Sequence, residues 1–204
     1  CNVIVFFAIK LNPLLVRSFV KSNVLISRGQ YHRLLTSTFT HTDLIHIGMN
    51  LYSLYNVGPY FENKFGKFRY ILIYIMSGIL ANLGTYMLDL TPLAIGASGS
   101  IFGLTGGLAM FYYRNRYVIK DESKSGLQYI KNVILINLIH AFGSSNIDQN
   151  GHIGGFIAGA MLSYLFGPRL VRRNDRYGYD RIMDKPIINY RKIFNQVQAK
   201  YSNE

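Results

Sequence analysis

The amino-acid sequence predicts an all-α membrane protein, a bundle of six transmembrane helices of which the first is truncated in this chain. Half of the 204 residues are hydrophobic and only 16% are charged. A mean hydropathy of +0.14 would also fit a soluble protein, so the prediction depends on where the charges lie. Long windows without charged residues, separated by connections that are alternately basic and not basic, favour the membrane.

The predicted helices follow from these windows. The chain begins with CNVIVFFAI, nine residues before Lys10, which are too few to span a bilayer and which we interpret as the end of a first helix. Five windows without Asp, Glu, Lys or Arg follow, each close to the roughly 17–25 residues that a spanning helix needs: 44–61, 70–88, 90–113, 132–147 and 151–168. A soluble helical core is the alternative, but so many apolar windows would leave it too little polar surface.

The basic residues predict the orientation. Of the 22 Lys and Arg residues, 17 lie in 62–69, in 114–131 and after Pro168, whereas 89–95 and 143–150 contain none. The positive-inside rule places the basic connections and the tail on the cytoplasmic or organelle-interior side. The other five basic residues, between Lys10 and Arg33, we place outside.

In this topology the net charge of +12 sets the orientation of the chain and faces the lipid bilayer. We expect the tail, 168–204, to be a partly ordered basic appendage near the anionic leaflet. Nucleic-acid binding is the competing explanation of the charge, but no basic-aromatic motif supports it.

Polar side chains at membrane depth are energetically expensive and are therefore functional candidates. The candidates are His46, Asn50, Ser98, His140 and His152. In the predicted topology the second, fourth and sixth helices run inward, so four of the five lie at similar depth near the outer surface; His140 lies near the outer end of the fifth helix. A serine and a histidine at matching depth suggest a nucleophile, Ser98, and its general base, His152.

Glycines explain how two helices could bring these side chains together. Small residues spaced four apart occur on the fourth and sixth helices, at Gly103 and Gly107 and at Gly155 and Gly159. Such pairs let helix backbones approach closely, near enough for Ser98 to hydrogen-bond His152. Gly96 and Gly99 permit an irregular turn around the serine.

Negative charge developing at Ser98 would lie at a helix N-terminus, whose dipole stabilises it. His46 and Asn50 are four residues apart on one helix face. Together with the Ser98 backbone N–H they are candidate oxyanion donors.

Other interpretations exist for each residue. A serine in a glycine-rich helix is often a packing residue, and a histidine at a helix end is often interfacial. A metal site would use His41, His46, His140 and His152, but the chain has no HExxH motif, and His41 and His46 are five apart, off one helical face. We therefore expect no metal and no cofactor. Asp148, four residues before His152, is a candidate third catalytic member, although we expect it to face the aqueous connection.

These motifs resemble the rhomboid intramembrane serine proteases. GASGSIFG at 96–103 is similar to the family's Gly-x-Ser-Gly motif, and HIGGFIAG at 152–159 to its last core helix. HTDLIHIGMN at 41–50 resembles its His-xxx-Asn element, and Arg33 matches the arginine of its first loop. His32 stands where many members have Trp, and Phe102 stands where some members have Tyr. The resemblance implies a core at 29–167, preceded by the end of the first helix and the start of the first loop at 1–28 and followed by the tail.

The resemblance also implies a function. It assigns Ser98 and His152 to a catalytic dyad, and His46, Asn50 and Gly96 to oxyanion and substrate binding. The expected reaction is cleavage of single-span membrane proteins near the membrane surface. The alternatives are a catalytically silent rhomboid-like binder, whose class lacks the Ser or the His, and a transporter, which would need charged groups at the midplane. The stretches YSLYNVGPYFENKFGKFRYILIY and YLFGPRL resemble the plastid or cyanobacterial-type branch of the family, which slightly favours a plastid membrane and leaves mitochondrial, apicomplexan and bacterial origins open.

Overall fold

The computed structural model describes residues 1–142, 148–174 and 180–189, except for the side chains of 136–142. Five long helices form the bundle: α5 (Leu44–Phe65), α6 (Lys67–Met87), α7 (Ser98–Asn115), α8 (Lys120–Phe142) and α9 (Gln149–Phe166). Shorter elements precede them: α1 (Asn2–Leu11), α2 (Leu14–Phe19), β1 (Lys21–Ser22), α3 (Asn23–Ser27), α4 (Arg33–Thr36) and the 3-10 helix η1 (Ser37–Phe39). The strands β2 (Leu93–Ala94), β3 (Leu170–Asn174) and β4 (Asp180–Asp184) complete the described elements.

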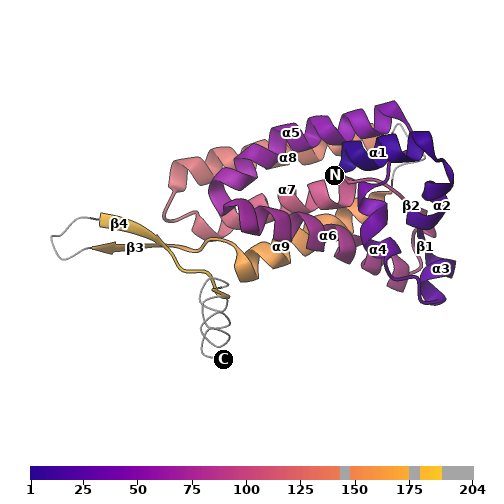
Figure 1. Cartoon of the computed structure of the whole chain (residues 1–204). Coiled ribbons are helices and arrows are strands. Elements are labelled where there is room, and N and C mark those ends of the chain that lie inside the picture. Colours follow the sequence, from indigo (N-terminus) through magenta and orange to yellow (C-terminus); the bar gives the residue numbers. More distant parts are fainter. Residues whose placement is uncertain (143–147, 175–179, 190–204) are drawn as a thin grey trace, which may run out of the picture.

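The helix α7 lies at the centre of the bundle (Figure 1). It packs most extensively against α9 and contacts α5, α6 and α8 as well. Its apolar side chains recur every three to four residues and are buried, at Ile101, Leu104, Leu108 and Phe111. A helix without charge over most of its length suits this central place, because it has packed neighbours on every side.

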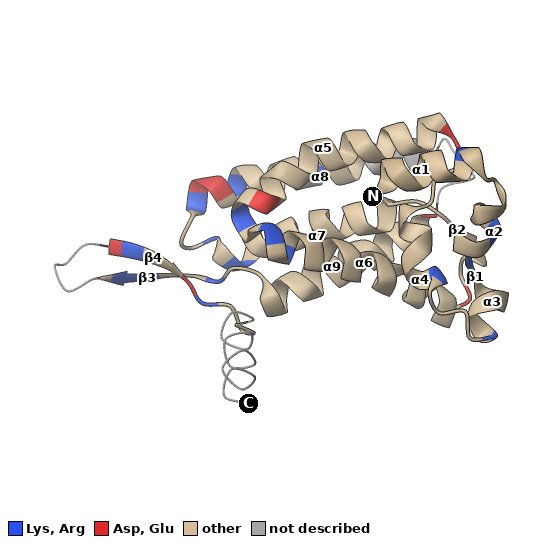
Figure 2. Cartoon of the chain, viewed as in Figure 1, with Lys and Arg blue, Asp and Glu red and all other residues tan. Residues whose placement is uncertain are grey.

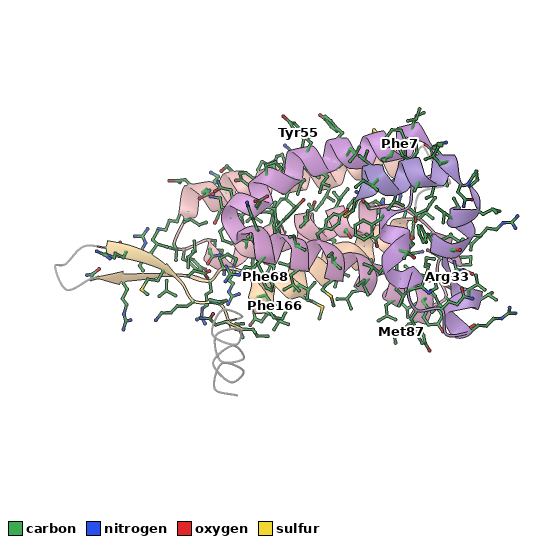
Figure 3. The ribbon with its side chains drawn as sticks, in the orientation of Figure 1. Phe7, Arg33, Tyr55, Phe68, Met87 and Phe166 are labelled. Atoms are coloured by element: carbon green, nitrogen blue, oxygen red, sulfur yellow. The ribbon has the colours of Figure 1, made fainter. Side chains whose placement is uncertain are left out.

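The segment between α1 and α5 folds over one end of the bundle. It contains α2 and α3 as well as β1, which pairs antiparallel with β2, Lys21 opposite Ala94. Arg33 is buried and ties the segment together: its Nη1 donates to the carbonyls of Arg17 and Val20, each at 2.8 Å. Figure 3 shows Arg33 at the opposite end of the bundle from Phe68 and Phe166.

The fourth predicted helix begins at Ser98, as the glycine-rich turn before it indicated, and the first part of the window 90–113 is a loop and β2. One predicted boundary is wrong. The connection predicted over 114–131 is largely helical, because α8 already begins at Lys120. Asp121 and Glu122 lie in the first turn of α8, where acidic side chains complement the positive end of the helix dipole. A search for charge-free windows misses such a turn.

The distribution of side chains suits a bundle surrounded by lipid. Most charged residues gather at the two ends of the bundle (Figure 2), and Lys131 lies about halfway along α8. Large apolar side chains point outward along the helices, among them Ile4, Tyr55, Ile71, Ile153, Ile157 and Met161. By length and composition alone, α6 is the one helix in the described part of the chain that is apolar enough to cross a membrane, and α1 is apolar but shorter.

The start of the tail forms a hairpin, in which Val171 lies opposite Met183. The hairpin extends beyond the end of the bundle (Figure 1). Arg69 of α6 pairs with Asp184 at 2.6 Å. The Asn115 amide donates to the Pro168 carbonyl and accepts from the Leu170 N–H. These contacts fix the base of the hairpin to the ends of α6 and α7.

Candidate active site

The turn before α7 brings Ser98 to the first position of that helix. Gly96 has φ of +113°, a conformation that favours glycine, and its N–H donates to the Ser37 carbonyl at 2.9 Å. Ser98 is half-buried. Ser100, by contrast, is fully buried, and its Oγ has no hydrogen-bond partner in the described structure.

The glycines of α7 and α9 form a seam at which the two backbones touch. A Cβ added to Gly155 would overlap the Gly99 carbonyl, and one added to Gly159 would overlap the Gly103 carbonyl. Farther along, Ser163 donates to the Gly107 carbonyl at 2.9 Å. Because the seam is in register, the N-terminal ends of α7 and α9 lie side by side.

The seam places His152 in the first turn of α9, beside the first turn of α7. Its imidazole stacks on the Phe102 ring, with centroids 4.3 Å apart and planes at 13°. Phe102 is four residues after Ser98, so both are on one face of α7. No hydrogen bond joins Ser98 and His152 in the part of the chain that the structure describes. Such bonds often tighten only when substrate is bound.

The other predicted residues approach from α5. Asp43 caps this helix by accepting from the His46 N–H at 2.7 Å. The His46 Nε2 lies 2.6 Å from where a Cβ on Gly96 would be, so a side chain at that position would displace the imidazole. Asn50 is buried, and one N–H of its amide donates to the His46 carbonyl at 3.0 Å. The structure thus brings His46 against the turn that precedes Ser98.

His41 is a residue of this site to which the sequence assigned no role other than that of a possible metal ligand. It is fully buried, and its ring meets the His46 ring edge-on at 4.9 Å. Its Nδ1 donates to the Phe39 carbonyl, and its Nε2 accepts from the Ala97 N–H, each at 3.3 Å. Because Nε2 accepts while Nδ1 carries the proton, this pair of bonds requires the neutral ring. Burial first, and then the neighbouring His46, lowers the pKa of His41 to about 4.

Two further candidates have different outcomes. Asp148 is the N-cap of α9: its Oδ1 accepts from the Gly151 N–H at 2.9 Å and from the Thr91 hydroxyl at 2.8 Å. These bonds direct the carboxylate to the helix end rather than to the imidazole. The side chain of His140 lies outside the described residues. Among the described residues, no group of three His, Cys, Asp or Glu side chains is arranged to hold a metal ion.

Comparisons with known proteins identify the class. The Rhomboid domain matches residues 28–169, and the chain therefore belongs to the rhomboid family, whose members are helical proteins integral to the membrane. The rhomboid protease GluP of Bacillus subtilis is 34% identical over 172 residues, which are 81% of this chain and 33% of GluP. A second protein of that bacterium, YdcA, is 34% identical over 153 residues, 74% of this chain and 75% of YdcA.

One relative bears directly on activity. The inactive RHOMBOID-like protein 8 of Arabidopsis thaliana is 34% identical over 140 residues, covering 68% of this chain and 39% of the relative. The family thus includes both proteases and an inactive member at the same level of identity to this chain.

Proposed function

We propose that this chain is an active intramembrane serine endopeptidase with Ser98 as nucleophile and His152 as general base. The observation that carries the proposal is the seam between α7 and α9, which sets the first turns of the two helices side by side. The Phe102 ring holds the imidazole on the face of α7 that carries Ser98. A hydroxyl becomes a useful nucleophile when a neighbouring base takes its proton.

The reaction uses the residues of this site in turn. The Ser98 Oγ attacks the scissile carbonyl while His152 takes the hydroxyl proton and then delivers it to the leaving amine. The resulting acyl-enzyme on Ser98 is hydrolysed by water, which His152 activates in the same way. No cofactor takes part.

The oxyanion needs donors at the N-terminal end of α7. The Ala97 N–H is occupied by His41, whereas the Ser98 N–H lies in the first turn of α7, in which N–H groups have no partner within the helix. His46 and the second N–H of the Asn50 amide approach from α5, and Gly96 leaves room for the imidazole. Losing one such donor lowers the rate on the order of 10²–10³-fold.

The proposed substrate is a single-span membrane protein. A transmembrane helix hides its carbonyls in its own hydrogen bonds, so the segment must unwind before Ser98 attacks. Ser98 lies at the end of α7 that follows the loop from α6, away from the charged hairpin. The cleavage site is therefore close to one membrane surface.

The proposal includes a topology of six spans, with α1 in the first and α5 to α9 as the others. Residues 29–167 form the protease core, and 168–204 the basic tail on the inner side, near lipid headgroups. The dyad chemistry is the same in a plastid, mitochondrial or bacterial membrane. A silent rhomboid-like binder is the alternative, and the presence of both Ser98 and His152 favours the protease.

Acylation by a fluorophosphonate in detergent, together with cleavage of a reconstituted single-span substrate, tests the proposal. We expect the wild-type protein to react, and Ser98→Ala and His152→Ala to abolish both signals. Ser100→Ala is the matched serine control and His140→Ala the matched histidine control, and both should retain most activity. A well-folded His152→Ala protein with substantial turnover, or equal losses from the two serine variants, would contradict the dyad.

A further inference from the structure

The N-terminal turn of α9 is fixed by Asp148. Its Oδ1 accepts from the Gly151 N–H at 2.9 Å, and its backbone carbonyl accepts from the His152 N–H at 3.1 Å. The first turn of α9, with its histidine, is therefore attached to Asp148 through both side chain and backbone. A shift of Asp148 would therefore be passed to the backbone of the turn that carries His152.

Asp148 is in turn bonded to the segment that leads into α7. The Thr91 hydroxyl donates to the same Oδ1 at 2.8 Å. Thr91 lies in the connection after α6, which ends at Met87, and it precedes β2, the turn at Gly96 and Ser98. This one hydrogen bond connects the segments that enter the two helices carrying the proposed nucleophile and base.

The first loop holds Thr91 from its other side. Lys21 is fully buried, and its Nζ donates to the Thr91 carbonyl. Its strand β1 pairs with β2, and the Asn23 N–H donates to the Pro92 carbonyl at 3.0 Å. Asn23 also donates to Asp89 at 2.7 Å. A buried lysine requires compensating charge, and the carboxylates whose charge acts on it are Asp148 and Asp89.

We propose that Lys21, Thr91 and Asp148 form an outer clasp that sets the position of His152 relative to Ser98. In this clasp Asp148 is a positioning residue that acts through the start of α9 and does not contact substrate. The inference rests on the proposed function of Ser98 and His152. It gives a role to the contact among the first loop, the connection from α6 to α7 and the start of α9. A residue that only capped α9 would not need this contact.

The test compares Thr91→Val with Thr91→Ser in the full chain. The valine variant loses the donor to Asp148 at nearly constant volume, whereas the serine variant keeps it. We expect Thr91→Val to slow fluorophosphonate acylation of Ser98 by about 10- to 100-fold, since a misplacement of about 1 Å can lower a rate ~100-fold. The KM for a membrane substrate should change little while kcat falls, and Thr91→Ser should restore the rate.

Matched variants separate positioning from general destabilisation. Thr85→Val also removes a buried threonine hydroxyl, but that hydroxyl donates to the Asn82 carbonyl within α6 and not to the cap of α9. Asp148→Ala should lower the rate as Thr91→Val does, and the double variant should be no slower than either. Asp148→Asn, which keeps a capping oxygen, should retain most of the rate. Equal losses from Thr91→Val and Thr85→Val would overturn the clasp.

A second readout separates this proposal from the proposed function. Hydrogen exchange of the Gly151 and His152 amides should accelerate in Thr91→Val and not in Thr85→Val. Unchanged exchange at these amides in Thr91→Val overturns the clasp, whether or not the enzyme is active. A wild-type chain that never reacts at Ser98 overturns the proposed function, while the exchange result still decides whether the clasp exists.

Discussion

The two sides of the bundle are joined in different ways. On one side α7 and α9 meet backbone to backbone, with Gly99 against Gly155 and Gly103 against Gly159. On the other side, α5 shares no extensive contact with α8 over the described residues, and the partially exposed Lys64 and Glu122 form an ion pair between these helices. Hydrogen-bonded tyrosines, Tyr60 and Tyr112, join α5 to α7.

This difference divides the proposed catalytic groups. Ser98 and His152 lie at the seam, where the backbones of the two helices touch with almost no side chain between them. His46 and Asn50 belong to α5, and His46 meets Gly96, while His41, just before α5, accepts from the Ala97 N–H. The proposed nucleophile and base are thereby held by backbone packing, and the proposed oxyanion donors by side-chain contacts at one end of a less tightly packed helix.

The largest effect should come from a single methyl group in the seam. In Gly159→Ala the added Cβ would overlap the Gly103 carbonyl, and a backbone cannot move aside as a side chain does. Overpacking lowers the free energy of unfolding by about 1–3 kcal/mol and occasionally by more. We expect a value of about 3 kcal/mol or above, measured by thermal melting in detergent, with loss of most acylation at Ser98.

The matched control is Gly84→Ala on α6. No heavy atom lies within 4 Å of a Cβ added there, and the glycine is helical. Alanine favours a helix over glycine by up to about 1 kcal/mol, so this variant should be as stable as the wild type or slightly more stable. If the two alanine variants melt alike, the seam is not the rigid side of the molecule.

The sequence predicts the seam better than it predicts the other side. Glycines spaced four apart indicate close helix contact without any knowledge of the partner, and the windows beginning at 44 and 151 begin close to α5 and α9. The contact between His41 and Ala97 spans 56 residues and depends on the fold of the first loop, so no local pattern reveals it. The same is true of Thr91 and Asp148, which are 57 residues apart.

The charge-free window that contains α7 starts before the helix, although the glycine-rich turn correctly indicated Ser98 as the first helical position, whereas the start of α8 was mispredicted. Apolar residues before Ser98 form β2 and a turn that Gly96 permits, and their lack of charge resembles that of a helix. The first turns of α8 are charged because they lie at the end of the bundle, where polar side chains reach water (Figure 2). Charge alone thus locates the middle of a membrane helix more accurately than its ends.

The second prediction concerns the end of α5 that meets the seam and uses pH. The pKa of His41 is about 4 in the folded chain and near 6.5 when unfolded. Between these values the unfolded chain binds a proton that the folded chain does not, so stability is full above pH 6.5 and falls as pH falls toward 4. We expect the wild type to lose about 2 kcal/mol of unfolding free energy between pH 7 and 4.5 because of this group.

The control is His41→Gln, which has no titrating group but keeps an oxygen that can accept from the Ala97 N–H. Its melting temperature should depend less on pH than that of the wild type over the same interval. His46 and Asp43 also face His41, so the difference between the two proteins, rather than either curve, measures the effect. Parallel curves would show that α5 is not joined to α7 through a neutral His41.

The smallest effect should come from the opposite end of α5. Lys64 and Glu122 are partially exposed, and an ion pair between such side chains contributes about 0.5 kcal/mol, which salt screens. We therefore expect Lys64→Ala to change the free energy of unfolding by no more than this, with acylation at Ser98 changed less than about twofold. The double variant Lys64→Glu with Glu122→Lys restores the pair in reverse and should recover any loss, and the difference should vanish in high salt. A loss as large as that of Gly159→Ala would mean that α5 and α8 are joined as firmly as α7 and α9, and the contrast between the two sides of the bundle would be wrong.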